Sequence, residues 1–187
     1  MSTTDVTVAT DGSVIGFSTA RLVARRMTPA DEPWLAAIHS DPEVMQHIGG
    51  PRDEPTNRRW VAANVDHWEQ HGFGQWTLWS HDGEPVGRGG LRTIHPCVDE
   101  DIVEVGYTLA RAAWGKGYAT EAARAFVEIG FDQYDLPELG AITLLTNESS
   151  ARVLEKVGFV AERTVTRDIG PHRFWRLQTP GKAAYSS

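Results

Sequence analysis

The sequence predicts an α/β domain whose sheet combines antiparallel and parallel strands. Residues 75–80 and 86–92 alternate in polarity on either side of a short turn, which is typical of a hairpin. Residues 104–109, 119–130 and 141–145 have the patterns of a strand, a helix and a strand, and this kind of connection makes the two strands parallel. With 187 residues, of which 41% are hydrophobic, the chain is long enough for one domain with a sizeable core.

The N-terminal third predicts one strand followed by helices. Residues 1–18 are polar, and Asp11-Gly12 is either the turn of a small hairpin or part of a frayed terminus. Residues 21–25 alternate as the first strand. Helix starts follow near Pro29 and Pro42, and residues 56–71 carry apolar side chains at helical spacing.

The C-terminal half alternates helix and strand. The stripe of small and apolar residues in 119–130 predicts a helix that lies close to the sheet, and the apolar run 141–145 predicts a strand covered on both faces. Asn147 is a good N-cap for a helix that ends at Gly158. The last strands are expected over residues 159–165 and 174–178.

A glycine loop connects the strand 104–109 to its helix. It has the sequence Trp114-Gly115-Lys116-Gly117-Tyr118-Ala119-Thr120, and glycines at the start of a helix let backbone N–H groups converge on an anion. The loop is not a P-loop, because Ala110 and Gly117 occupy positions where that motif needs glycine and Ser or Thr. The glycine spacing of a Rossmann turn is also missing.

The loop resembles the coenzyme A loop of the GNAT superfamily of N-acetyltransferases. Gly117 and Ala119 match its two small positions, whereas Trp114 stands where Arg or Gln is commoner. The sequence from Trp114 to Glu121 is similar to that of the branch that acetylates the N-terminal alanine of ribosomal proteins. The stretch from Asn147 to Phe159 resembles the second half of the same signature, so the resemblance spans about residues 19–178.

This resemblance implies a mixed, mostly antiparallel sheet of six or seven strands, flanked by helices and splayed open where acetyl-CoA lies. The strand 104–109 would pair with the pantetheine arm and the glycine loop would bind the pyrophosphate. The implied cofactor-binding residues are Tyr107, Thr108, Leu109, Trp114, Gly115, Lys116, Gly117, Tyr118, Ala119, Thr120, Asn147 and Ser150. Lys116 either adds charge for a phosphate or points to solvent.

Acetyl transfer by direct attack, as the resemblance implies, needs a neutral amine. At pH 7, deprotonating a lysine amine costs about 4.6 kcal/mol, but an α-amine costs only about 1–1.4 kcal/mol. Glu104, on the strand beside the cofactor, and Glu162, at a family position proposed as base in the ribosomal-protein branch, are the candidate bases. Either glutamate could instead simply bind a neighbouring arginine.

The leaving thiolate needs a proton. Many relatives supply it from a tyrosine in the helix after Asn147, but this chain has Leu154 there. Ser150 is the replacement candidate, although at this position of a helix it is also a possible capping partner. The leading hypothesis is therefore an acetyl-CoA-dependent N-acetyltransferase. The alternatives are a catalytically idle CoA-binding regulatory module and a plain nucleotide-binding domain.

The acceptor is expected to be a primary amine, either on a small molecule or at a protein N-terminus. The net charge of −7 disfavours nucleic acid as a partner and favours cationic molecules such as basic proteins. Several aromatic and histidine side chains are candidates for the walls of the acceptor site: Trp34, His39, His47, Ile48, Trp68, Phe73, Trp76 and His172.

The remaining features bound the prediction. We expect a cytoplasmic monomer or homodimer, because the sequence contains neither a membrane span nor a signal peptide. The expected organisation is an N-terminal extension (1–18), an acetyltransferase domain (19–178) and a C-terminal tail (179–187). Cys97 is the only cysteine and is interpreted as incidental. His67 and His71 are interpreted as surface residues and no metal is expected, since a third ligand is not evident.

Overall fold

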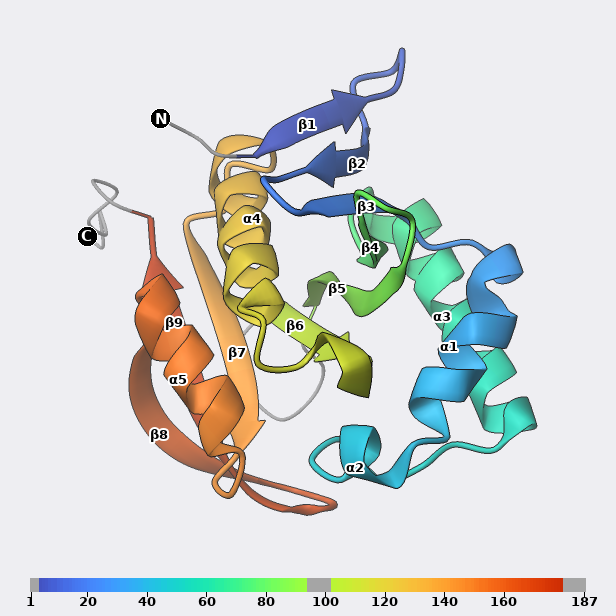
Figure 1. The fold of residues 1–187 in the computed structure, drawn as a ribbon. Coiled ribbons are helices and arrows are strands. Elements are labelled where there is room, and N and C mark those ends of the chain that lie inside the picture. Colours follow the sequence, from blue (N-terminus) through green and yellow to red (C-terminus); the bar gives the residue numbers. More distant parts are fainter. Residues whose placement is uncertain (1–3, 94–101, 180–187) are drawn as a thin grey trace.

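The computed structural model describes residues 4–93 and 102–179, which build one nine-stranded sheet in the order β1-β2-β3-β4-β5-β6-β7-β9-β8 (Figure 1). The strands are β1 (Asp5–Val8), β2 (Val14–Ser18), β3 (Leu22–Arg26), β4 (Gln75–Ser80), β5 (Pro85–Thr93), β6 (Val103–Leu109), β7 (Glu138–Leu144), β8 (Val160–Arg167) and β9 (Gly170–Gln178). The α-helices are α1 (Glu32–His39), α2 (Pro42–Met45), α3 (Glu54–His71), α4 (Tyr118–Asp132) and α5 (Glu148–Val157). Two 3₁₀ turns cover Pro29–Asp31 and Arg111–Ala113.

The mixed, mostly antiparallel sheet confirms the predicted fold class. Every neighbouring pair of strands is antiparallel except β6 and β7, which are parallel, as the strand–helix–strand pattern predicted. Seven of the strands are those expected from the sequence. The other two, β1 and β2, form the N-terminal hairpin, and β2 pairs with β3, so the hairpin extends the sheet of the domain.

Helix α4 packs on one face of the central strands. A Cβ atom built at Gly89 of β5 would lie 2.7 Å from the Phe126 ring, so only glycine lets this helix approach so closely. The Phe126 ring stacks on Trp76 of β4 at 5.7 Å. Helix α5 lies beside α4 on this side of the molecule (Figure 1).

Helices α1 and α3 cover the opposite face, and they pack against each other (Figure 1). Arg88 of β5 neighbours Gly89 in sequence, so its side chain points to the other side of the sheet. There it contacts His39 of α1 and Trp60 of α3. Trp68 and Trp76, which the sequence made candidates for an acceptor site, are instead buried in the core.

Strands β6 and β7 separate almost at once. Their only paired residues among those the structure describes are Glu104 and Gly140, although each strand has seven residues. Strand β6 pairs over its full length with β5, and β7 pairs over its full length with β9. The sheet is therefore continuous on both sides of an opening, and the backbone edges of β6 and β7 beyond Glu104 do not pair with each other.

The interpretation of His67 as a surface residue is wrong. The residue is buried, and its Nε2 accepts a hydrogen bond from the Thr93 backbone N–H at 3.3 Å. Its Nδ1–H therefore donates to the Phe73 carbonyl at 2.8 Å. His67 thus ties the end of α3 to β5. A group of three metal-ligating side chains does not occur within residues 4–93 and 102–179. Cys97 lies outside these residues. Of the helices described, none has the length and apolar composition to cross a membrane.

Candidate active site

The glycine loop begins the helix α4 in the conformation that the sequence predicted. Gly115 has φ +71° and Gly117 has φ +82°, both in the left-handed region that favours glycine. Gly117 is the N-cap of α4, whose 15 residues align their dipoles toward it. The first N–H groups of a helix lack partners within the helix. This end of α4 therefore favours a phosphate group.

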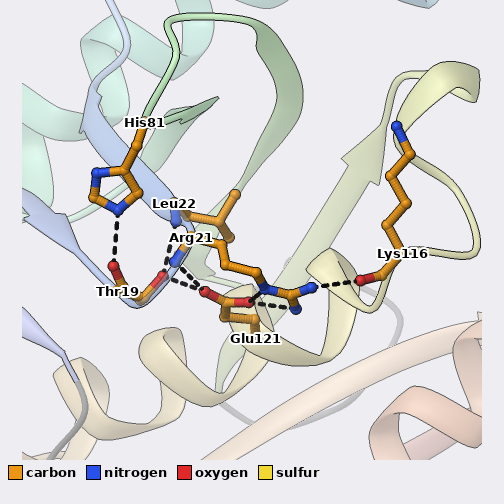
Figure 2. A network of polar contacts seen from close by, with 6 residues as sticks. All are labelled: Thr19, Arg21, Leu22, His81, Lys116 and Glu121. Carbon is orange, nitrogen blue, oxygen red and sulfur yellow. Dashed lines mark hydrogen bonds and ion pairs between the residues drawn. The ribbon is translucent and has the colours of Figure 1, made fainter.

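Residues from the β2–β3 turn hold the loop in place (Figure 2). The Arg21 side chain donates from Nε to Glu121 of α4 at 2.6 Å and from Nη1 to the Lys116 carbonyl at 2.7 Å. The Thr19 hydroxyl donates to the same Glu121 carboxylate at 2.6 Å. Burial raises the pKa of Glu121, but the bonds from Thr19 and Arg21 outweigh this effect and hold it below its ordinary value. The carboxylate therefore stays ionised and fixes Arg21 against the loop.

Replacing Arg21 by Ala is expected to weaken acetyl-CoA binding roughly 5- to 10-fold. The change removes charge-assisted hydrogen bonds, each of which contributes about 1.5–3 kcal/mol. Without them the glycine loop is less well ordered, so part of this free energy is lost from acetyl-CoA binding. Calorimetric titration with acetyl-CoA measures the effect. Arg58→Ala is the control because Arg58 forms an exposed ion pair with Glu54 on α3, away from the loop. Equal affinities for the two variants would show that the hydrogen bonds of Arg21 do not contribute to acetyl-CoA binding.

A cavity of about 440 Å³ extends from the glycine loop along the end of β6 to the start of α5. This volume suits a small-molecule site, for which roughly 300–1,000 Å³ is usual. Eleven of the twelve predicted cofactor-binding residues line it: Tyr107, Thr108, Leu109, Trp114, Gly115, Gly117, Tyr118, Ala119, Thr120, Asn147 and Ser150. Lys116 does not line it, and its side chain extends away from Arg21 and Glu121 in Figure 2.

A second cavity of about 390 Å³ opens on the side of α1 and α3. It shares Tyr107, Thr108 and Ser150 with the first cavity, so the two meet at the opening in the sheet. Cross-strand pairs place Thr108 opposite Arg88 and Glu104 opposite Arg92, on the face that α1 and α3 cover. Tyr107 pairs with Gly89 and faces the α4 side. The two cavities therefore adjoin at β6 and the start of α5, and residues from both faces of the sheet line them.

Glu104 lies at the point where β6 and β7 part. Burial raises the pKa of its carboxyl above the ordinary value. The charges of Arg167, Arg92 and Arg88 and a hydrogen bond from the Ile142 backbone oppose that shift without cancelling it. A carboxylate with a raised pKa in a cavity is suited to accept a proton near neutral pH. The environment of Glu104 is thus that of a candidate general base.

Glu162 does not line either cavity. Its carboxylate accepts a hydrogen bond from Arg176 Nε at 2.7 Å and lies 3.2 Å from Arg163 Nη1. Both arginines are neighbours on the two C-terminal strands. The structure thus shows Glu162 in the ion-pairing role that was the alternative to catalysis, and it does not bring Glu162 together with Glu104.

Tyr107 and Ser150 lie close together and line both cavities. The Tyr107 hydroxyl is buried and has no hydrogen bond of normal geometry with any residue the structure describes. Burial raises the pKa of Tyr107 to about 12, and the nearby Ser150 hydroxyl partly offsets this effect. Ser150 is held by its backbone N–H, which donates to the Asn147 side chain at 3.1 Å. Two protonated hydroxyl groups are therefore available at the opening.

Four arginines that line the second cavity were missed by the sequence analysis, and one of them is Arg167 of β8. Arg52, Arg88 and Arg92 line the second cavity together with Trp60 and Gln75. Arg88 and Arg92 lie four residues apart on β5, so they share a face of the strand. Of the predicted acceptor-site residues, Ile48, His47 and His172 do line this cavity.

A sheet opened between two parallel strands, with a glycine loop and a helix N-terminus at its mouth, is the arrangement of a coenzyme A-dependent acyltransferase. Residues 21–160 match the family model described as acetyltransferase (GNAT) domain. The chain belongs to the GNAT acetyltransferase family, and it is an acetyl-CoA-dependent N-acetyltransferase.

Several known proteins are similar to this chain. The uncharacterized protein YkkB of Bacillus subtilis (strain 168) is 32% identical over 80% of this chain and 87% of its own length. The uncharacterized N-acetyltransferase YoaA of the same organism is 28% identical over 78% of this chain and 83% of its own. The crystal structure of ribosomal-protein-S5-alanine acetyltransferase from Vibrio fischeri has a TM-score of 0.71, covering 91% of this chain and all of that chain. At 17% identity, this last likeness shows the shared fold.

Proposed function

We propose that the enzyme transfers the acetyl group of acetyl-CoA to a primary amine by direct attack, without a covalent enzyme intermediate, and that residues 19–178 form the catalytic domain. The observation that carries this proposal is the opening between β6 and β7, near which the cavity at the glycine loop meets the cavity lined by Glu104 and the arginines. The pyrophosphate would lie on the backbone of 115–120 and the pantetheine arm along Tyr107, Thr108 and Leu109. The thioester then lies where the two cavities meet.

In this proposal the amine enters from the α1–α3 side. Its nitrogen attacks the thioester carbonyl carbon, and the carbon–sulfur bond breaks as the amide bond forms. The amine proton passes to Glu104, directly or through a water. Backbone N–H groups near Leu109 would stabilise the oxyanion. Glu104 and the acceptor cavity lie on the same face of the sheet, which supports this assignment.

The thiolate leaves on the other face, next to Tyr107 and Ser150. We propose Ser150 as the group that protonates it, with the Tyr107 hydroxyl beside it. This pair takes the place of the usual tyrosine, since Leu154 is buried at that position. The raised pKa of Tyr107 keeps its hydroxyl protonated at neutral pH, so the pair retains a proton to donate.

Release of free thiol from acetyl-CoA tests the proposed function. The expected result is thiol release that depends on both enzyme and amine, together with an acetylated amine of the expected mass. A panel should contain small primary amines and peptides with free N-termini. An enzyme that binds acetyl-CoA but acetylates none of them would point back to the idle CoA-binding module.

Ser150→Ala is expected to lower kcat roughly 10-fold or more while changing the affinity for acetyl-CoA less than about twofold. The backbone N–H that bonds to Asn147 is retained, so the helix start is not altered. Ser149→Ala is the matched control, because Ser149 lines only the cofactor cavity and bonds to the same Asn147 side chain. Unchanged turnover in Ser150→Ala would remove this residue as the acid.

A further inference from the structure

Positive charge is concentrated in the acceptor cavity. Four arginines line it, Arg52, Arg88, Arg92 and Arg167, against two carboxylates, Glu104 and Asp168. The chain as a whole carries a net charge of −7. The sign of the cavity is therefore opposite to that of the protein, and opposite to what a cationic acceptor would need.

The hydrogen-bond partners of Arg88 are uncharged. Asn57 donates from Nδ2 to Glu32, which turns its Oδ1 toward His39, 2.7 Å from Nδ1. His39 Nδ1 therefore carries the proton, and Nε2 accepts from Arg88 Nε at 3.0 Å. Burial, then the charge of Arg88, lowers the pKa of His39 to about 3, so the ring is neutral. The second partner, Gln75, is a neutral amide that accepts from Arg88 Nη1 at 3.3 Å.

Two of the guanidinium groups lie on one aromatic ring. The central carbon of Arg88 is 4.3 Å from the centroid of the Trp60 ring, and that of Arg52 is 4.8 Å from it. Burial, then the charge of Arg92, lowers the pKa of Arg52 to about 10, so Arg52 is still charged at neutral pH. Among the described residues, no carboxylate forms an ion pair with Arg52, Arg88 or Arg92. Like charges are thus held side by side, and the carboxylate of Glu104, which interacts electrostatically with Arg88 and Arg92, forms no direct ion pair with them.

We infer that the acceptor is a small primary amine that also carries an anionic group, a carboxylate or a phosphate, and that Arg52, Arg88 and Arg92 bind this group. The inference rests on the proposed function and specifies its substrate class. Guanidinium groups match the planar geometry of carboxylates and the oxygens of phosphates. Within residues 4–93 and 102–179, only two of the five N–H groups of Arg88 have hydrogen-bond partners. The Arg88 side chain lines the cavity and 8% of the residue is exposed.

The same charges assist the reaction. A cationic environment disfavours a second positive charge, so it lowers the pKa of a bound ammonium group and increases the fraction that is the neutral nucleophile. The anionic group of the acceptor supplies the attraction that the ammonium group lacks. Glu104 lies opposite Arg92 on this face and remains available for the proton.

Matched amines test the inference. One pair is phenylalanine and phenylalaninamide, and the other is phosphoethanolamine and ethanolamine. For at least one pair we expect kcat/KM from thiol release, corrected for the fraction of neutral amine, to be about 10-fold or more higher for the anionic member. The pair that shows the difference distinguishes a carboxylate from a phosphate.

Substitutions of Arg52 test whether the arginine cluster causes the preference for anionic amines. Arg52→Gln is expected to lower kcat/KM for the preferred anionic amine about 10-fold or more, to change the uncharged partner less than about twofold, and to leave the Kd of acetyl-CoA unchanged. Arg52→Lys should restore part of the activity because it restores the charge. Arg59→Gln, on the exposed side of α3, is the matched control. Arg52 is chosen over the buried Arg88 because its replacement leaves the hydrogen bonds of Arg88 to His39 and Gln75 in place and removes a contact of 3.4 Å between Arg52 Nη1 and His39 Nδ1.

Three results would overturn the inference. These are equal rates for the anionic and uncharged members of both pairs, no turnover of either anionic amine by an enzyme that binds acetyl-CoA, and a loss in Arg52→Gln that appears in acetyl-CoA affinity instead. In the first case the proposed acetyltransferase activity would stand. If the enzyme neither binds acetyl-CoA nor releases thiol with any amine, the proposed function fails along with the inference.

Discussion

Glu104→Gln lowers kcat by about 10²- to 10⁴-fold, which is the usual contribution of a general base, while acetyl-CoA affinity stays within about twofold. The carboxylate lies at the parting of β6 and β7, on the face where the acceptor cavity opens. Glutamine keeps the shape of the side chain but cannot accept the amine proton. Thiol-release kinetics measure kcat, and calorimetry measures the binding.

The pH profile gives a second readout of the same residue. Burial raises the pKa of Glu104, and only the ionised form is a base. In the wild type, kcat/KM is therefore expected to rise with pH through this raised pKa and to be lost below it. The Gln variant should lack this limb of the profile. Glu162→Gln is the matched control, because that carboxylate is held by Arg176 outside both cavities. If Glu162→Gln were the slower variant, the assignment of the base would be wrong.

Gly117→Val lowers acetyl-CoA affinity about 100-fold. Gly117 has φ +82°, a conformation that a β-branched residue rarely adopts, and a Cβ atom there would lie 3.3 Å from Arg21 Nη2. The loop must shift, and it then loses backbone hydrogen bonds to the pyrophosphate. Loss of about 3 kcal/mol, equivalent to two hydrogen bonds to a charged group, corresponds to this factor. Calorimetric titration measures it.

Gly83→Val separates strain from binding. Gly83 lies in the β4–β5 turn with φ +85°, and a Cβ atom there would meet nothing within 4 Å. Both variants therefore carry a similar backbone strain of roughly 1–2 kcal/mol, measurable as a lower Tm. Only Gly117→Val should lose acetyl-CoA. Equal affinities in the two variants would mean that the loop does not bind the cofactor.

The elements governed by local chemistry were predictable from the sequence. The β4–β5 hairpin, the parallel pair β6 and β7, the glycine loop and the Asn147 cap all depend on residues close together in the chain. The N-terminal hairpin was only one of two interpretations of residues 1–18, because the few apolar residues there do not distinguish a strand paired with β3 from a frayed terminus. Its partner is set by the tertiary structure.

The parts of the site that depend on distant segments were not predictable in this way. Glu104 and Glu162 are both strand glutamates, and only the packing shows that Glu104 enters a cavity while Glu162 meets Arg176. The arginine cluster joins the loop after α2 to β5. The one local signal was on β5, where Arg88 and Arg92 share a face of the strand, and an arginine on a covered face needs a partner or a ligand.

Amide hydrogen exchange with and without acetyl-CoA tests the central claim most directly, because it reports where the cofactor binds. If the cofactor threads the opening between β6 and β7, exchange should slow at residues 107–109, whose backbone would pair with the pantetheine arm, and at 115–120, which would bind the pyrophosphate. The β1–β2 hairpin should exchange as before. Unchanged exchange at both segments with saturating acetyl-CoA, or protection confined to another part of the sheet, would contradict the account.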